Sequence, residues 1–113
     1  MIININNRKF KVKVVFSKKD TSKGMMNKLF DTTFNGMLFL MEPGDHAFWM
    51  KNCLVNLDII FIKNNKITKI HRNCPPCQTE DCPNYFGDGD MVLELKGGSC
   101  DKFGIKEGDS ILF

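Results

Sequence analysis

The sequence lacks any long run of apolar residues. A membrane-spanning helix needs about 20 consecutive apolar residues, and a secretory signal needs an apolar segment close to its start. Neither pattern occurs, and the chain opens with MIININNRKF. The sequence therefore predicts a cytoplasmic protein without a transmembrane segment.

Arginine is scarce. The chain has two arginines against fourteen lysines, and its net charge of +3 comes without a dense basic run. Proteins that read nucleic acids rely on arginine for bidentate contacts with phosphates and bases. We therefore expect a small molecule or another protein as the partner, rather than a nucleic acid.

The motifs of the commonest enzyme classes are also absent. The chain contains no G-x-S-x-G, P-loop, H-E-x-x-H or G-x-G-x-x-G pattern. This absence excludes the usual signatures of hydrolases, nucleotide-binding proteins and metalloproteases. The sequence thus leaves the cofactor, if any, and the reaction unknown.

Short stretches of alternating apolar and polar residues are abundant. With 113 residues, 42% of them hydrophobic, the chain is long enough for one domain over residues 1–113 and too short for two. The alternation predicts an all-β domain, a small β-sandwich or barrel with one or two short helices. Strands are expected within 2–16 (two strands around Asn6-Asn7), 37–41, 55–62, 66–71, 91–96 and 111–113.

The connections contain residues typical of turns. Asn64-Asn65 suits a tight hairpin turn that pairs 55–62 with 66–71. A further turn is expected at Glu42–Asp45, and a long irregular loop is expected over Asn73–Asp90, which is rich in Pro, Cys and Gly.

Two short helices are expected. Side-chain oxygens of Asp20–Ser22 can cap a helix that packs Met25, Met26 and Leu29 against the sheet. Methionines in such a row are usually core filler. Ser99 can cap a second helical turn.

The central element is the stretch Phe48–Lys63, FWMKNCLVNLDIIFIK, which contains the only tryptophan. From Val55 onward one face of the predicted strand is wholly apolar. Continued back toward Trp49, the same face would bury Lys51, and an unpaired buried charge is very costly. We therefore expect a bulge or bend near 51–56.

Several motifs occur together in this chain: GMLF, FWMKN followed by LDIIFI, then PPC, CPNY and VLEL. They resemble the family known as domain of unknown function 192 over about Gly24 to Phe113. The resemblance implies a compact β-sandwich or barrel of jelly-roll type. It implies no activity. Because many members look exported or membrane-tethered, it leaves an extracytoplasmic location open.

The segment from His71 to Cys82 holds three thiols and an imidazole within twelve residues. Zinc binding by Cys74 or His71 with the other thiols is one interpretation, and a thioredoxin-like site at C-P-P-C is a second. A disulfide between Cys77 and Cys82 is the third, and the resemblance favours it because these are the two family-like positions. Since five cysteines cannot all pair within one chain, at least one thiol is expected to be free, bound to a metal or bonded to another molecule.

Polar residues within apolar strands form the second candidate site. Trp49, Lys51, Asn52, Asp58 and Glu94 would form a ligand-binding cluster if their side chains shared one face of the sheet. The structural alternatives are an ion pair that fixes strand register, or Asp58 capping a loop backbone.

Ligand or partner binding, where the FWMKN bend meets the cysteine-rich loop, is the function that these patterns favour. One alternative is a small enzyme with Asp58 or Glu94 as general base and Lys51 as electrostatic stabiliser. Another is a structural or assembly accessory protein. A nucleophile formed by Cys53 with His46 or His71 has no recognisable flanking signature.

Overall fold

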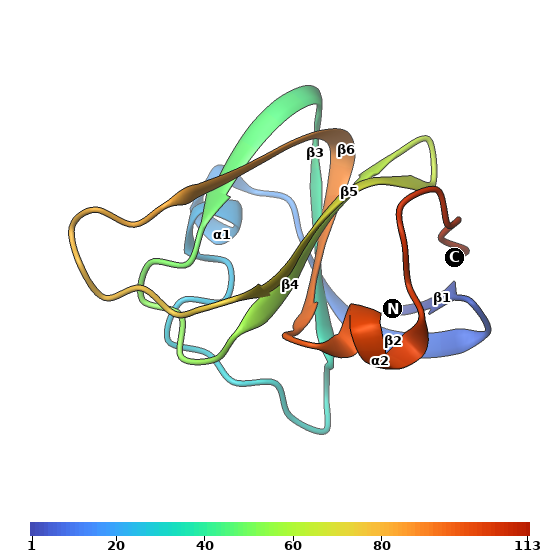
Figure 1. Ribbon diagram of the computed structural model, residues 1–113, viewed down its shortest axis with the longest axis horizontal. Helices are drawn as coiled ribbons and strands as arrows, with labels where there is room; N and C mark the ends of the chain where they lie inside the picture. The colour runs from blue at the N-terminus through green and yellow to red at the C-terminus, as the bar shows by residue number, and fades with distance from the viewer.

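The computed structural model describes all 113 residues as six strands and two short helices (Figure 1). The all-β class predicted from the sequence is confirmed. At six and five residues, neither helix is long enough to cross a membrane. The elements are β1 (Ile2–Ile5), β2 (Arg8–Val15), α1 (Lys18–Lys23), β3 (Gly36–Trp49), β4 (Leu57–Lys63), β5 (Lys66–Cys74), β6 (Asn84–Lys96) and α2 (Ser99–Phe103).

The strands form one curled sheet in the order β1-β2-β3-β6-β4-β5. All neighbours are antiparallel except β2 and β3, whose parallel pairing is made possible by the long connection through α1. The segment at the carboxyl end pairs with both edge strands, because Leu112 bridges to Asn4 of β1 and Ser110 to Lys66 of β5. The strand predicted over 111–113 is therefore reduced to isolated bridges that join the two sheet edges.

Both predicted hairpins are present. Asn64 and Asn65 have φ angles of 51° and 62°, and Asn6 and Asn7 have φ angles of 52° and 64°. Two successive residues with positive φ form the turn whose twist matches that of the flanking strands, and asparagine tolerates this conformation. The predicted pairing of 55–62 with 66–71 is confirmed as β4 with β5.

The first helix does not lie where the sequence predicted it. It begins earlier, because the Ser17 hydroxyl oxygen accepts a hydrogen bond from the Asp20 backbone N–H at 3.0 Å. It ends at Gly24, whose φ of 47° is incompatible with a continuing helix. Met25 packs in the core as expected, but Leu29 is exposed.

Two predicted irregular segments belong to strands. The expected turn at Glu42–Asp45 lies within β3, where a register shift between Leu40 and Gly44 accommodates the extra residues. The expected loop over Asn73–Asp90 is much shorter, since β5 continues through Cys74 and β6 already begins at Asn84.

The glycines of β6 explain this second error. A Cβ atom added to Gly87 would lie 2.3 Å from the Phe61 ring, and one added to Gly89 would lie 2.3 Å from the Ile62 carbonyl oxygen. These glycines permit β6 to pass close over β4, and they mark close approach of two strands rather than a loop.

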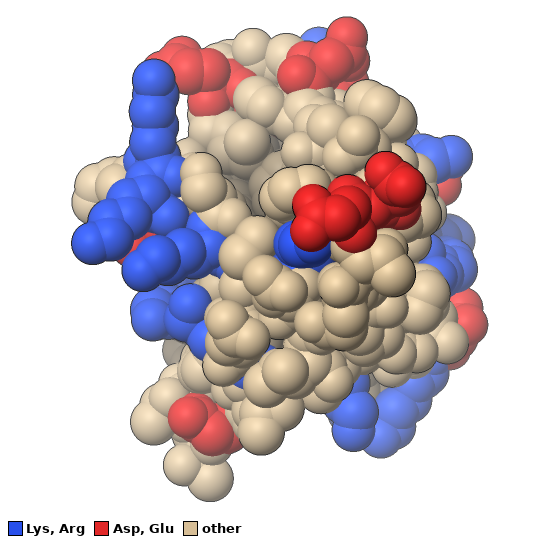
Figure 2. All heavy atoms as spheres, turned by 90° about the vertical axis from the view of Figure 1, so that its left-hand side faces the viewer, with Lys and Arg blue, Asp and Glu red and all other residues tan.

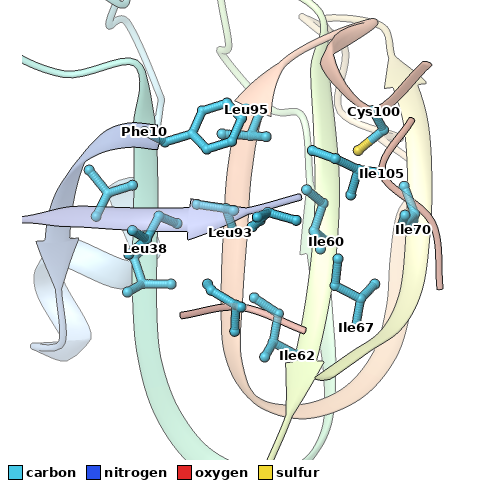
Figure 3. Packing of buried hydrophobic residues seen from close by; sticks show 14 residues of the cluster. Phe10, Leu38, Ile60, Ile62, Ile67, Ile70, Leu93, Leu95, Cys100 and Ile105 are labelled. Carbon is cyan, nitrogen blue, oxygen red and sulfur yellow. The ribbon is translucent and has the colours of Figure 1, made fainter. Parts of the chain in front are cut away.

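The sheet separates two hydrophobic cores. One core consists of 14 buried residues, among them Leu38, Ile60 and Leu93, and residues from the carboxyl-terminal segment close it (Figure 3). The other consists of 11 buried residues, including Phe39, Ile59 and Met25. Because successive residues of a strand face opposite sides, each of the two buried polar residues, Asp58 in β4 and Glu94 in β6, lies on the side of one core or the other.

Candidate functional site

A cavity of about 330 Å³ lies between β3 and the segment formed by α1 and the turn that follows it. This end of the molecule is on the left in Figure 1, and in Figure 2 its surface is hollowed beside a group of basic side chains. The lining residues are Thr21, Ser22, Lys23, Gly24, Met25, Met26, Phe39, Met41, Ala47, Phe48, Trp49, Cys53 and Glu94.

Glu94 provides the only carboxyl group in this lining. It lies opposite Ile59 in the β4–β6 register, so its side chain belongs to the face of the second core, and the residue is only 3% exposed. Burial raises the pKa of this carboxyl to about 8, and neither a hydrogen bond nor a neighbouring cation lowers it. Glu94 is therefore mostly uncharged at neutral pH.

The walls of the cavity are aromatic and sulfur-containing. Phe39 and Phe48 meet edge to face with ring centroids 4.9 Å apart. Trp49 is 44% exposed and stands at the end of β3, whereas Met25 is buried. These side chains offer polarisable surface and few hydrogen-bond donors.

Cys53 lies in the bend between β3 and β4 and contributes its buried side chain to the wall. Burial, together with the nearby Glu94, raises the pKa of its thiol to about 12. A protonated thiol is a poor nucleophile. His46 and His71 hold the carbonyl oxygens of Glu42 and Phe86 through Nε2, at 2.6 and 2.7 Å, so neither imidazole is engaged with Cys53.

Asp58 lies on the opposite side of the sheet from Glu94. It pairs with Leu95, the residue next to Glu94, and successive residues of a strand face opposite sides of the sheet. Its carboxylate accepts hydrogen bonds from three backbone N–H groups, those of Asn73 at 2.7 Å, Gly98 at 3.1 Å and Cys100 at 2.8 Å. Asp58 thus caps the start of α2, which is the structural alternative that the sequence left open.

Lys51 and Asn52 do not line the cavity either. The Lys51 ammonium group donates to the carbonyl oxygen of Thr79. The backbone N–H of Asn52 donates to the Cys77 carbonyl at 3.0 Å, and the Asn52 carbonyl accepts from Asn27 at 2.8 Å. Both residues fix the bend to its neighbours.

The structure therefore divides the five residues of the predicted polar cluster. It brings Trp49 and Glu94 together at the cavity and places Lys51, Asn52 and Asp58 elsewhere. The condition for a single charged cluster, a shared face of the sheet, is not met, because the β4–β6 register directs Asp58 and Glu94 into different cores.

The cysteine-rich loop is closed by a disulfide between Cys77 and Cys82, with Cα atoms 5.8 Å apart. Cys53, Cys74 and Cys100 are free and buried. Because Cys74 packs in the second core and His71 is bonded to a carbonyl, the structure does not gather the loop's thiols and imidazole around one point.

The disulfide loop rests on the FWMKN bend. The Gln78 side chain donates to the Cys53 carbonyl at 2.9 Å, and the Cys77 N–H donates to the Met50 carbonyl at 3.2 Å. The predicted meeting of bend and loop is therefore present. The loop therefore contacts the bend that carries Cys53, and no loop residue enters the lining.

Sequence reasoning missed most of the lining. Met25 and Met26 were interpreted as core filler, and Phe39 and Met41 as parts of an ordinary strand. The available signal was Glu94, a carboxyl between two leucines of an apolar strand.

The family model of DUF192, described as "Uncharacterized ACR", matches residues 1–113. The chain belongs to this family. The match covers the whole chain and extends the resemblance seen in the motifs to the first two strands. No curated protein matches the chain.

Two solved structures resemble this DUF192 protein. A Novosphingobium aromaticivorans protein of unknown function is 27% identical, with a TM-score of 0.86 over 99% of this chain and 84% of that one. A Sinorhizobium meliloti protein, named as a candidate transcription regulator, is 26% identical, with a TM-score of 0.84 over 97% of this chain and 90% of that one. Both share the fold.

Proposed function

We propose that this protein binds a small organic molecule in the cavity between α1 and β3, with the Glu94 carboxyl group as the polar anchor. The single observation that supports the proposal is the position of Glu94, a carboxyl that is only 3% exposed, lies in the cavity lining and has no hydrogen bond or ion pair to the rest of the protein. Leaving such a group unpaired is costly for a fold, and groups of this kind occur preferentially at functional sites.

The size of the cavity is consistent with this role. Pockets for small ligands typically measure about 300 to 1,000 Å³, and they combine apolar walls with a few polar groups that orient the ligand. The cavity of about 330 Å³ has this composition, with Phe39, Phe48 and Trp49 beside Glu94. It therefore suits a ligand at the small end of the range.

Two of the three residues named for the enzyme alternative, Asp58 and Lys51, lie outside the cavity. Asp58 is occupied by three backbone amides, and Lys51 reaches across to the disulfide loop. Glu94 remains as a group whose pKa of about 8 suits proton transfer near neutral pH. No second group in the lining is placed to stabilise a developing negative charge except the exposed Lys23, so binding is the better supported function.

Binding can be tested with a fragment library and ¹⁵N-labelled protein observed by NMR. We expect hits to shift the amide signals of Gly24–Met26 and Phe48–Trp49. The variant Ala47→Trp, which adds an indole to the lining, should remove these shifts. Leu112→Trp is the matched control, because Leu112 is exposed at the far carboxyl end, and it should bind as the wild type does.

A different outcome would refute the proposal. If fragments bind but shift signals outside the lining, or if Ala47→Trp binds them as well as Leu112→Trp, the cavity is not the site.

A further inference from the structure

We infer that the ligand is a small organic cation, a primary amine whose ammonium group pairs with Glu94 while its apolar part contacts the aromatic and methionine walls. This inference rests on the proposed function and specifies the class of ligand.

The charge balance of the cavity is the first argument. Glu94 is the only acidic group in the lining, and the only basic one is Lys23, which is exposed in the last turn of α1. A buried carboxylate needs an opposite charge with hydrogen-bond donors, and an ammonium group supplies both. The ammonium group of the ligand would thus provide the positive charge and the hydrogen-bond donors that no protein group provides to Glu94.

The nature of the walls is the second argument. Aromatic faces attract cations through the electron-rich ring surface. The lining contains three aromatic side chains, those of Phe39, Phe48 and Trp49. The methionines Met25, Met26 and Met41 add polarisable sulfur. Apart from Thr21 and Ser22 in α1, the lining has no side-chain hydroxyl or amide group, so a sugar or polyol would leave its hydroxyls unpaired.

The volume of the cavity suits a small amine. Since one water occupies about 30 Å³ in the liquid, the cavity of about 330 Å³ holds the equivalent of about eleven waters. A phenyl ring that carries a single aminomethyl arm fits within this space. Benzylamine is therefore a suitable probe, and benzyl alcohol is its uncharged counterpart with the same ring and a hydroxyl donor.

The binding of such a cation should depend on pH, because it requires the ionised carboxylate. The titratable groups around Glu94 are Lys23 in α1, Cys53 in the bend and Cys74 in β5. Burial raises the pKa values of the two thiols to about 12 and about 11, so both stay neutral between pH 6 and 8. With a Glu94 pKa of about 8, the ionised fraction is about fifty times larger at pH 8 than at pH 6.

The experiment measures the Kd of benzylamine and of benzyl alcohol by NMR titration at pH 6 and pH 8. At pH 8 the wild type should bind benzylamine at least about tenfold more tightly than benzyl alcohol, and this preference should shrink at pH 6. Glu94→Gln should lose the preference at both pH values. Glu107→Gln, a matched change at an exposed turn, should keep it.

Lys23 is the only cation in the lining, and Lys23→Met removes its charge. We expect this variant to bind benzylamine at least as tightly as the wild type. Removing a positive charge from the lining cannot weaken the binding of a cation, so a benzylamine affinity below that of the wild type would overturn the inference.

The remaining outcomes separate the inference from the proposed function. If benzyl alcohol binds in the cavity as tightly as benzylamine, or if Glu94→Gln retains the preference, the ligand is not a cation, although the cavity still binds small molecules. If neither probe shifts the signals of the lining and library fragments also fail to do so, both the inference and the proposed function are wrong.

Discussion

Replacing Glu94 with glutamine should change how the stability of the protein depends on pH. In the unfolded chain this carboxyl has the ordinary pKa of about 4.5, and in the folded protein burial raises the pKa to about 8. With respect to this group, the free energy of unfolding is therefore highest below pH 4.5. It decreases as the pH rises from 4.5 through 8. Between these values the unfolded state releases a proton that the folded state retains.

The magnitude follows from the size of the shift. Each pH unit between the two pKa values changes the unfolding equilibrium about tenfold, so the wild type should lose about 3 to 5 kcal/mol relative to Glu94→Gln between pH 4.5 and pH 8. Domains of this kind are stable by about 5 to 15 kcal/mol in total. The effect is therefore a large share of the stability and easy to measure.

Urea unfolding of both proteins at pH 5, 6, 7 and 8, followed by circular dichroism, provides the test. The free energies of unfolding should be similar at pH 5, and the variant should become the more stable protein at pH 8. Other groups titrate equally in both proteins, so the difference isolates Glu94. Glu107→Gln should follow the wild type. A wild-type-to-variant difference that stays constant across this pH range would refute the idea that Glu94 is an unpaired buried carboxyl.

Three further changes test the rest of the structure. Asp58→Ala should lower the free energy of unfolding by about 3 to 5 kcal/mol, because three backbone N–H groups, one buried and two partly buried, lose their acceptor; a loss below about 1 kcal/mol in urea unfolding would contradict the capping role. Reducing the Cys77–Cys82 bond, or replacing both cysteines with serine, should cost about 2 kcal/mol, since the closed loop is short, and an unchanged Tm would show that the bond does not restrain the chain. Gly89→Ala should destabilise the fold by at least about 2 kcal/mol in the same assay, because its Cβ would lie 2.3 Å from the Ile62 carbonyl oxygen; wild-type stability would show that β6 does not pass so close to β4.

Much of the strand content could be predicted, because the deciding signals lie within a few residues of one another. The Asn64-Asn65 pair both ends β4 and turns the chain into β5, and its two positive φ angles are a local property of asparagine. The bend after Trp49 was also predictable, since Lys51 could not continue the apolar face. In each case the periodicity and the turn residue indicate the same structure.

Other elements could not be placed from local signals. Asp20–Ser22 resemble caps as well as Ser17 does, and only the backbone path shows which oxygen accepts the bond. Gly87 and Gly89 have the composition of a loop, but the close approach of β4 is what requires them. Such contacts join residues far apart in the chain, and composition does not reveal them.

The candidate site shows the same division. By itself the sequence determined that Glu94 is unusual, because a carboxyl between two leucines in a strand conflicts with its apolar neighbours. It equally marked Asp58, and nothing in the local pattern distinguished the two. Only the tertiary structure decided between them. The β4–β6 register turns Asp58 toward the backbone amides of α2, and it turns Glu94 toward a cavity whose opposite wall is built by α1, some seventy residues earlier in the chain. Alternation gives each residue a face, but what covers that face depends on how distant segments fold over it.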